Sequence, residues 1–303
     1  MEKILIIKTG AAGDVLRTTS LLRALPNYEI TWVVGEANKE LLEGALEDEF
    51  INKIIAIENA KELEQLTTEK FDMFLSLDDD EISARTASAL KTDKLIGTYS
   101  DNGNLVYNDP SGWFDMGLIS RLGKQKADEL KKANTRSYQE FLFQMAGKKF
   151  YGEEYILEAA PKEVNKQIIG IEARSDNRWP LKRWDKYGLL KEKLEEKGYE
   201  VRLFEQRPTI NDFINDVNDC RLIITGDTLT MHIALALRKP TIAIFGPTSY
   251  NEIYDYGRLK KVIPPVSCNV CYKQRCDIKP NCMESISLEA VLEKLNKIIS
   301  SCK

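Results

Sequence analysis

Short apolar runs alternate with amphipathic stretches along most of the chain. The runs are rich in isoleucine, leucine and valine, as strands buried on both faces of a sheet are. Strands are predicted at 3–8, 29–34, 53–57, 72–77, 94–97, 168–171, 199–204, 222–225 and 241–245. Helices are predicted at 15–25, 37–46, 61–67, 82–91, 136–146, 184–197, 210–218 and 287–301, with one more after Thr228. This alternation predicts an α/β fold with parallel sheets.

A break in the pattern divides the chain. Residues 147–166 lack periodicity and contain Pro161, and a chain of 303 residues is usually two domains. We therefore expect domains at 1–160 and 161–303, with the final helix packing back toward the first domain. Residues 98–117, rich in Asn, Asp, Gly and Pro, are expected to form a long loop.

Charge differs between the two halves. Residues 1–160 hold 19 basic and 28 acidic residues, a net charge of −9, and residues 161–303 hold 24 and 19, a net charge of +5. The acidic half argues against a nucleic-acid partner, and the basic half suits a phosphate-bearing ligand. No apolar run approaches the ~20 residues that span a bilayer, and we expect no signal peptide before the first strand. We expect a cytoplasmic protein with at most peripheral contact with the inner membrane surface.

The segment Leu222–Ser249 carries the strongest local signal for a binding site. A strand ends at Gly226-Asp227-Thr228, a helix follows at once, and the next strand ends at Gly246-Pro247-Thr248. Thr228 or Thr230 can cap the helix, whose first amides favour an anion, and the sole histidine, His232, lies in the first turn. Polar turns are also needed in any βαβ unit, so this pattern alone leaves both interpretations open.

The segment Lys3–Leu25 has a similar form. A strand leads into Gly10-Ala11-Ala12-Gly13 and then Asp14, at the start of an amphipathic helix. It matches neither the dinucleotide fingerprint nor a P-loop, which need other glycine and lysine spacings. Asp14 could stabilise the helix N-terminus, or it could be a general base for a neutral hydroxyl.

Two other charged segments follow predicted strands. Glu205 comes after strand 199–204, where it could bind a nucleotide ribose or simply be solvated. The acidic run Asp78–Glu81 could bind a cation, but acidic residues are common at a helix N-terminus, and we leave this run out of the site.

Three motifs occur in order along the chain: Ile4–Lys8 with Gly13-Asp14-Val15, then Arg174–Pro180 with Arg183-Trp184, and then Asp227–His232 with Phe245–Thr248. Together they resemble glycosyltransferase family 9, the heptosyltransferase family. The resemblance implies two Rossmann-like domains facing each other across a cleft, the GT-B type. One departure is Leu229, where many members of the family have glycine.

The resemblance also implies roles for individual residues. Asp14, next to Gly13, matches the proposed catalytic base, and Arg178, with Arg174 nearby, matches the contact to the donor diphosphate. Phosphate and sugar would be held by Asp227, Thr228, Leu229, Thr230, Met231 and His232.

The activity implied is an inverting, metal-independent transfer of heptose or a related sugar. The donor would be a nucleotide sugar like ADP-heptose, and the acceptor a hydroxyl of a glycan or glycolipid in cell-envelope biosynthesis. No cofactor is expected for catalysis. A nucleotide-sugar epimerase of the same fold and a non-catalytic nucleotide- or glycan-binding protein remain alternatives.

Four cysteines gather near the end of the chain, at Cys268, Cys271, Cys276 and Cys282. In a cytoplasmic chain clustered thiols indicate a metal more than a disulfide, and four thiolates suit tetrahedral zinc. Only the first pair has the usual CxxC spacing. Structural zinc is one expectation, and reduced cysteines or a redox-sensitive loop are the other.

Overall fold

The computed structural model describes residues 1–113, 117–164, 168–175 and 179–301. The chain forms two compact units, residues 1–127 with 136–158, and residues 128–135 with 159–303. The division falls between Glu158 and Ala159, two residues before the expected boundary, and it also assigns residues 128–135 to the second unit.

The first unit is built on a six-stranded sheet in the order β3-β2-β1-β5-β7-β8. The strands are β1 (Glu2–Ile7), β2 (Tyr28–Val34), β3 (Lys53–Ala56), β5 (Met73–Ser76), β7 (Leu95–Asp101) and β8 (Asn104–Asn108). All neighbours pair in parallel except β7 and β8, which are antiparallel. Two short strands, β4 (Lys70–Phe71) and β6 (Lys91–Thr92), pair with each other.

Helices cover this sheet as the hydrophobic pattern predicts. They are α1 (Ala12–Thr18), η1 (Thr19–Ala24), η2 (Glu36–Leu42), α2 (Glu43–Glu47), α3 (Ala60–Leu66), α4 (Glu81–Ala89) and α6 (Tyr138–Met145). Leu66 of α3 and Ala87 of α4 share one buried cluster with Leu5 and Val33 of the sheet. Two of the predicted helices begin or end as 3-10 turns.

The predicted loop at 98–117 is partly wrong. Strand β7 continues to Asp101, turns at Asn102-Gly103, where both φ angles are positive, and returns as β8. Polar side chains suit this hairpin because it lies at the edge of the sheet, half in solvent. Helix α5 (Leu118–Ala133), broken at Gly123, was not predicted either, and the division between the units passes through it.

The second unit has a five-stranded, wholly parallel sheet in the order β10-β9-β11-β12-β13. Its strands are β9 (Ile168–Ile171), β10 (Glu200–Leu203), β11 (Leu222–Gly226), β12 (Thr241–Ile244) and β13 (Leu259–Val262). Its helical segments are η3 (Pro180–Lys182), α7 (Tyr187–Glu196), α8 (Ile210–Asn218), α9 (Leu229–Ala236) and α10 (Leu288–Ser301).

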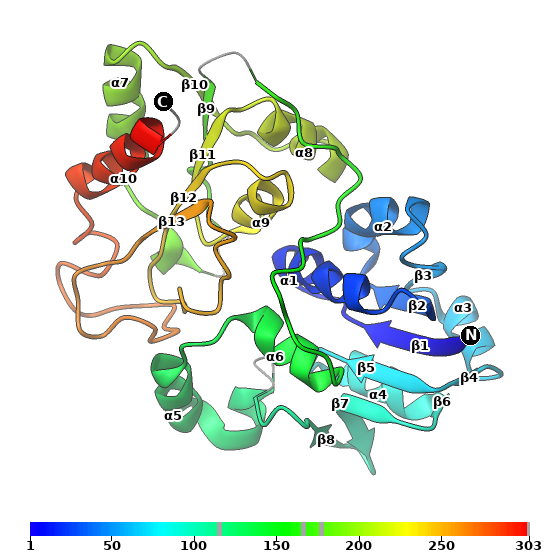
Figure 1. Cartoon of the computed structure of the whole chain (residues 1–303). Helices are drawn as coiled ribbons and strands as arrows, with labels where there is room; N and C mark the ends of the chain where they lie inside the picture. Colours follow the sequence, from blue (N-terminus) through cyan, green and yellow to red (C-terminus); the bar gives the residue numbers. More distant parts are fainter. Residues whose placement is uncertain (114–116, 165–167, 176–178, 302–303) are drawn as a thin grey trace. The chain divides into compact units, whose positions relative to one another are not determined.

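Helices lie on both faces of this second sheet. Within the unit, α7 and α10 lie on one side and α8 and α9 on the other (Figure 1). Leu190 of α7 and Val291 of α10 are fully buried in one cluster with Ile171 and Ile224 of the sheet. The final helix therefore packs in the second unit's core, and its expected contact with the first domain stays a prediction.

Each sheet is doubly wound, so the strand order reverses direction at one point. In the first sheet this switch lies between β1 and β5, and in the second between β9 and β11. Ligands of open parallel sheets bind at the carboxyl ends of the strands beside such a switch. Of the helices that the structure describes, none combines the length and apolarity needed to span a bilayer.

Candidate active site

Asp14 lies at the switch point of the first sheet. Helix α1 starts five residues after β1 ends, and Asp14 is in its first turn, with its main-chain N–H 2.8 Å from the Ala11 carbonyl. Ala11, at the N-cap, has a φ of 40°, an unusual value for a residue that is not glycine. The side chain of Asp14 keeps 19% of its surface exposed, so its carboxylate can reach a ligand.

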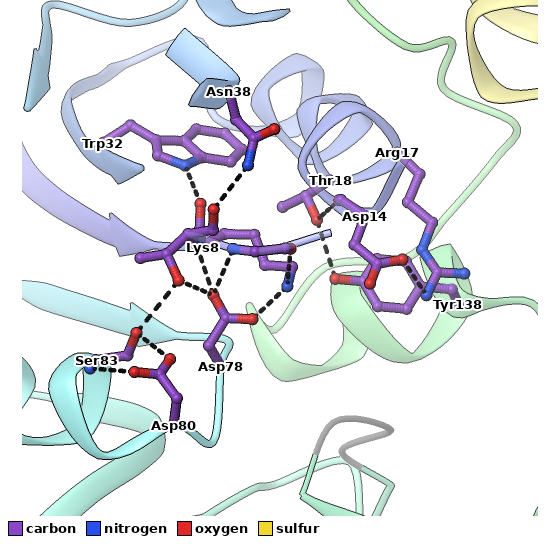
Figure 2. A network of polar contacts seen from close by, with 12 residues as sticks. Lys8, Asp14, Arg17, Thr18, Trp32, Asn38, Asp78, Asp80, Ser83 and Tyr138 are labelled. Atoms are coloured by element: carbon purple, nitrogen blue, oxygen red, sulfur yellow. Dashed lines mark hydrogen bonds and ion pairs between the residues drawn. The ribbon is translucent and has the colours of Figure 1, made fainter. Parts of the chain in front are cut away.

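The carboxylate of Asp14 is paired with an arginine of the same helix. Arg17 Nη2 lies 2.9 Å from Asp14 Oδ1, and the guanidinium stacks 3.7 Å from the ring centroid of Tyr138 in α6. Figure 2 shows this group beside a second network around Lys8.

Lys8 and Asp78 form an ion pair that the sequence analysis missed. Lys8 is buried, and its ammonium donates to Asp78 and to the Gly10 carbonyl, 2.8 Å away. Asp78 also accepts from the Thr9 N–H at 2.5 Å and the Thr9 hydroxyl at 2.9 Å. Burial alone would lower the pKa of Lys8, but the nearby carboxylates of Asp78 and Asp14 raise it. The pair ties the loop after β1 to the end of β5, across the switch point (Figure 2).

The rest of the acidic run has separate structural roles. Asp80 caps α4, accepting from the N–H groups of Ile82 and Ser83 at 3.0 Å each, as acidic residues at helix starts commonly do. Asp79 accepts from the Ser120 hydroxyl at 2.5 Å, and burial raises the pKa of its carboxyl. Glu81 pairs with Arg85 one turn later in α4, so each of the four acidic residues has structural partners of its own.

In the second unit, Asp227 follows β11 and is held by two side chains. Lys182 Nζ lies 2.8 Å from Asp227 Oδ2, and the Thr248 hydroxyl donates to the same oxygen at 2.7 Å. Burial raises the pKa of Asp227, but the Lys182 ammonium and both hydrogen bonds outweigh burial and hold the pKa at about 2. Asp227 is therefore ionised at neutral pH.

The position of Lys182 depends on a close approach between the backbone of η3 and that of the segment after β12. Lys182 ends η3, which lies over the ends of β11 and β12. A Cβ on Gly246 would lie only 2.9 Å from the Leu181 carbonyl oxygen and 2.8 Å from Met283 Sδ, so this approach requires glycine. The sequence does not show that Gly246 and Leu181 meet, and Lys182, the next residue, was not among the predicted site residues.

Helix α9 begins beside Asp227 with its N-terminus facing the strand ends. Thr228 is the N-cap, but its hydroxyl pairs with Thr225 at 3.0 Å instead of capping the helix. The Met231 N–H donates to the Thr228 carbonyl at 3.1 Å, and a helix N-terminus of this kind favours an anion. Leu229 is partly exposed in this turn, whereas the side chains of Met231 and His232 are buried and His232 has interactions of its own.

Across the switch point, Arg174 follows β9 and is paired with Glu172. Its guanidinium makes two hydrogen bonds to the Glu172 carboxylate, at 2.9 and 2.6 Å, and these raise the pKa of Arg174. The Thr230 hydroxyl donates to the same carboxylate at 3.2 Å. Glu172 thus joins Arg174 to the start of α9. Glu205, after β10, is exposed.

The predicted site residues that the structure describes form two groups, one in each unit. Gly13 and Asp14 lie in α1 of the first unit, and Arg174, Glu205 and the Asp227–His232 segment lie at the strand ends of the second. Arg178 lies outside the described residues.

The four clustered cysteines line one small cavity. Cys268 is exposed, Cys271 and Cys276 are partly exposed, and Cys282 is buried. Burial is the largest cause that raises the pKa of Cys282, and the three nearby thiols raise it further. Within the described ranges, no three His, Cys, Asp or Glu side chains are arranged to hold a metal ion. As they lie, the thiols do not form a finished zinc site, and zinc stays a prediction.

Two larger hollows of the second unit lie away from the predicted donor residues. One is lined by Pro180, Leu181, Trp184 and Asn281. The other is lined by Ile168, Leu222 and Ile298, at the opposite ends of the strands. Neither includes Asp227 or Arg174. The chemistry of the strand ends, not the size of a hollow, therefore identifies the candidate site.

Comparisons with known proteins point to one family. The family model of glycosyltransferase family 9 (heptosyltransferase) matches residues 207–281. Lipooligosaccharide heptosyltransferase 2 of Campylobacter jejuni is 30% identical over 108 residues, which are 35% of this chain and 34% of that relative. The match thus spans about a third of the relative's length.

Two solved structures resemble the chain over nearly its whole length. E. coli ADP-heptose lps heptosyltransferase II gives a TM-score of 0.69 at 19% identity and covers 99% of each chain. The family 9 glycosyl transferase from Veillonella parvula gives 0.73 at 16% identity, covering 99% of this chain and 98% of that one. These two likenesses show the GT-B fold, with two Rossmann-like α/β domains. The sequence matches point to glycosyltransferase family 9 over part of the chain, and the likeness to the two solved structures extends over nearly all of it.

Proposed function

We propose that the protein is an inverting, metal-independent glycosyltransferase with Asp14 as its catalytic base. It transfers heptose or a related sugar from a nucleotide-sugar donor to a hydroxyl of a glycan or glycolipid. The observation that carries the proposal is the carboxylate of Asp14, partly exposed and held by Arg17 at the switch point of the first sheet.

In the proposed reaction Asp14 takes the proton of the acceptor hydroxyl as its oxygen attacks the anomeric carbon of the donor. The bond from that carbon to the diphosphate oxygen breaks, and the nucleoside diphosphate leaves with the electron pair. A single displacement inverts the anomeric centre.

The second unit supplies positive charge for the leaving diphosphate in this scheme. Lys182, Arg174 and the N–H groups at the start of α9 lie at the strand ends of its sheet. A helix N-terminus and fixed cations stabilise developing negative charge, so the step needs no metal ion. Asp227, ionised and turned toward Lys182 and Thr248, would accept hydrogen bonds from hydroxyls of the donor sugar.

The relatives suggest which substrates to test. The names of the similar proteins include ADP-heptose and lipooligosaccharide. We propose an ADP-heptose-like donor and a lipooligosaccharide or related acceptor. The protein would act in the cytoplasm, with at most peripheral contact with the inner membrane surface.

The test is turnover of ADP-heptose by the full chain, with truncated lipooligosaccharide as acceptor and a chelator present. Donor binding is measured separately by calorimetry. We expect Asp14→Asn to lower kcat by about 10³-fold or more, within the usual range for loss of a catalytic base, while the Kd for ADP-heptose stays within twofold.

A matched control is Asp80→Asn. It changes a carboxylate that caps α4, and an asparagine retains the cap, so turnover should persist. Normal turnover by Asp14→Asn would show that the base is another group. Donor consumption without an acceptor would favour an epimerase, and binding of ADP-heptose without any consumption would favour a binding protein.

A further inference from the structure

We infer that Arg17 and Tyr138 are positioning residues for Asp14, held in a closed ring of contacts that fixes both its carboxylate and its backbone. The inference rests on the proposed function, since it concerns the base of that reaction.

The ring consists of four contacts among four residues. Asp14 Oδ1 pairs with Arg17 Nη2 at 2.9 Å, and the Arg17 guanidinium lies 3.7 Å from the ring centroid of Tyr138. The Tyr138 hydroxyl is 2.9 Å from the Thr18 hydroxyl, which donates to the Asp14 carbonyl at 2.7 Å. Figure 2 shows Tyr138 below α1 with Arg17 and Thr18 meeting it from the helix.

Without this ring of contacts, the Asp14 carboxylate could adopt a second orientation. Helix α1 has no side-chain cap, and an aspartate in the first turn can bend back toward free N–H groups at the helix start. Arg17, one turn later, draws the carboxylate in the other direction. Because the pair engages Oδ1 and the side chain stays 19% exposed, the carboxylate is oriented and still open to a proton donor.

Arg17 is itself immobilised, which makes it an effective support. Its side chain is only 6% exposed, and a guanidinium that stacks on an aromatic face in a buried site is held in one orientation. Lys8, whose pKa is raised by Asp78 and Asp14 despite its burial, places a second cation on the other side of the loop.

Tyr138 comes from a distant but rigid element. It is the first residue of α6, which starts with a capping box formed by Ser137 and Glu140. The residue is 6% exposed, and it lies 120 positions after Thr18 in the sequence. Tyr138 is thus a buried aromatic residue that also has a polar contact, through its hydroxyl and that of Thr18.

The test compares kcat and KM for ADP-heptose in Arg17→Gln, Arg17→Lys and Tyr138→Phe, with lipooligosaccharide as acceptor. A displacement of about 1 Å at a reacting group can cost about 100-fold in rate. We expect Arg17→Gln to lower kcat by roughly 10- to 100-fold with an unchanged KM. Arg17→Lys should recover part of the loss, and Tyr138→Phe should show a smaller loss.

A second measurement separates positioning from a general loss of structure. In an Asp14→Asn background there is no base to position, so Arg17→Gln should leave the residual turnover unchanged. Arg23→Gln is the matched control, because Arg23 also lies over an aromatic ring, that of Phe50, without touching Asp14.

Three outcomes would overturn the inference. They are an unchanged kcat in Arg17→Gln, an equal fall of kcat with and without Asp14, and a fall in Arg23→Gln of the same size. Full activity of Asp14→Asn alone would instead overturn the base assignment of the proposed function, so the two failures are distinguishable.

Discussion

Replacing Lys182 by methionine tests the ion pair that holds Asp227. The substitution keeps the length and the apolar stem of the side chain and removes the ammonium. Asp227 would then retain the Thr248 hydroxyl but lose its cation, in a position where its side chain is only 15% exposed. A carboxylate left with little solvent and no opposite charge is destabilising.

The pKa of Asp227 sets the size of the effect. A change from the ordinary value of 3.8 to about 2 corresponds to about 2 kcal/mol of folding free energy, at about 1.36 kcal/mol per pKa unit. Because the folded pKa is the lower one, this stability is present above pH 3.8 and is lost as pH falls through about 2. We expect Lys182→Met to cost about 2–3 kcal/mol at neutral pH, below the usual range for fully buried pairs, because both partners keep some solvent contact.

Hydrogen exchange of the β11 and β12 amides measures the opening free energy of the second unit within the full chain. Asp227→Asn alone and Lys182→Met with Asp227→Asn complete a double-mutant cycle. The coupling energy should be about 2 kcal/mol, and the double variant should be more stable than Lys182→Met. A loss under about 0.5 kcal/mol, the limit for ordinary surface changes, or a double variant as unstable as Lys182→Met, would refute the reasoning.

Two further predictions concern other parts of the chain. Lys8→Met leaves the buried Asp78 without its cation and should lower the stability of the first unit by about 3–5 kcal/mol. Faster hydrogen exchange of the β1 amides would measure this loss. Partial recovery in Lys8→Met with Asp78→Asn would support this cause, and unchanged β1 exchange would contradict it. If the cysteines bind zinc, elemental analysis of the purified chain should find about one zinc per molecule, as a four-thiolate site holds. That zinc should be lost in Cys271→Ser with Cys276→Ser. Absence of zinc from the unchanged chain would leave packed or redox-active thiols as the explanation.

Much of the fold could be predicted because the local pattern is strong. The runs ending at Ile7, Val34 and Ile171 are mostly apolar, and each is an interior strand in the structure. The hairpin at 95–108 was missed because an edge strand half in solvent needs no such run. Helix α5 was missed as well, and Gly123, with a φ of 74°, interrupts its helical geometry.

The candidate site, too, could be predicted from the sequence only in part. Asp14 and Asp227 stand out in the sequence because each follows a strand and a glycine. Lys8, Lys182 and Glu172 do not stand out, since a lysine or glutamate beside a strand is most often solvated. Only their burial and their partners show that they hold the site together.

By itself the sequence determined the alternation of strands and helices, the resemblance to one family, and the residues expected at strand ends. The tertiary structure decided which strand ends are neighbours. The order of strands in a parallel sheet is not encoded in any one strand, because it follows from how the crossover helices pack. That order brings Lys8 to Asp78, 70 residues apart, and Lys182 to Asp227, 45 residues apart. Such pairs form only when the whole sheet has closed around its core, so no local pattern can reveal them.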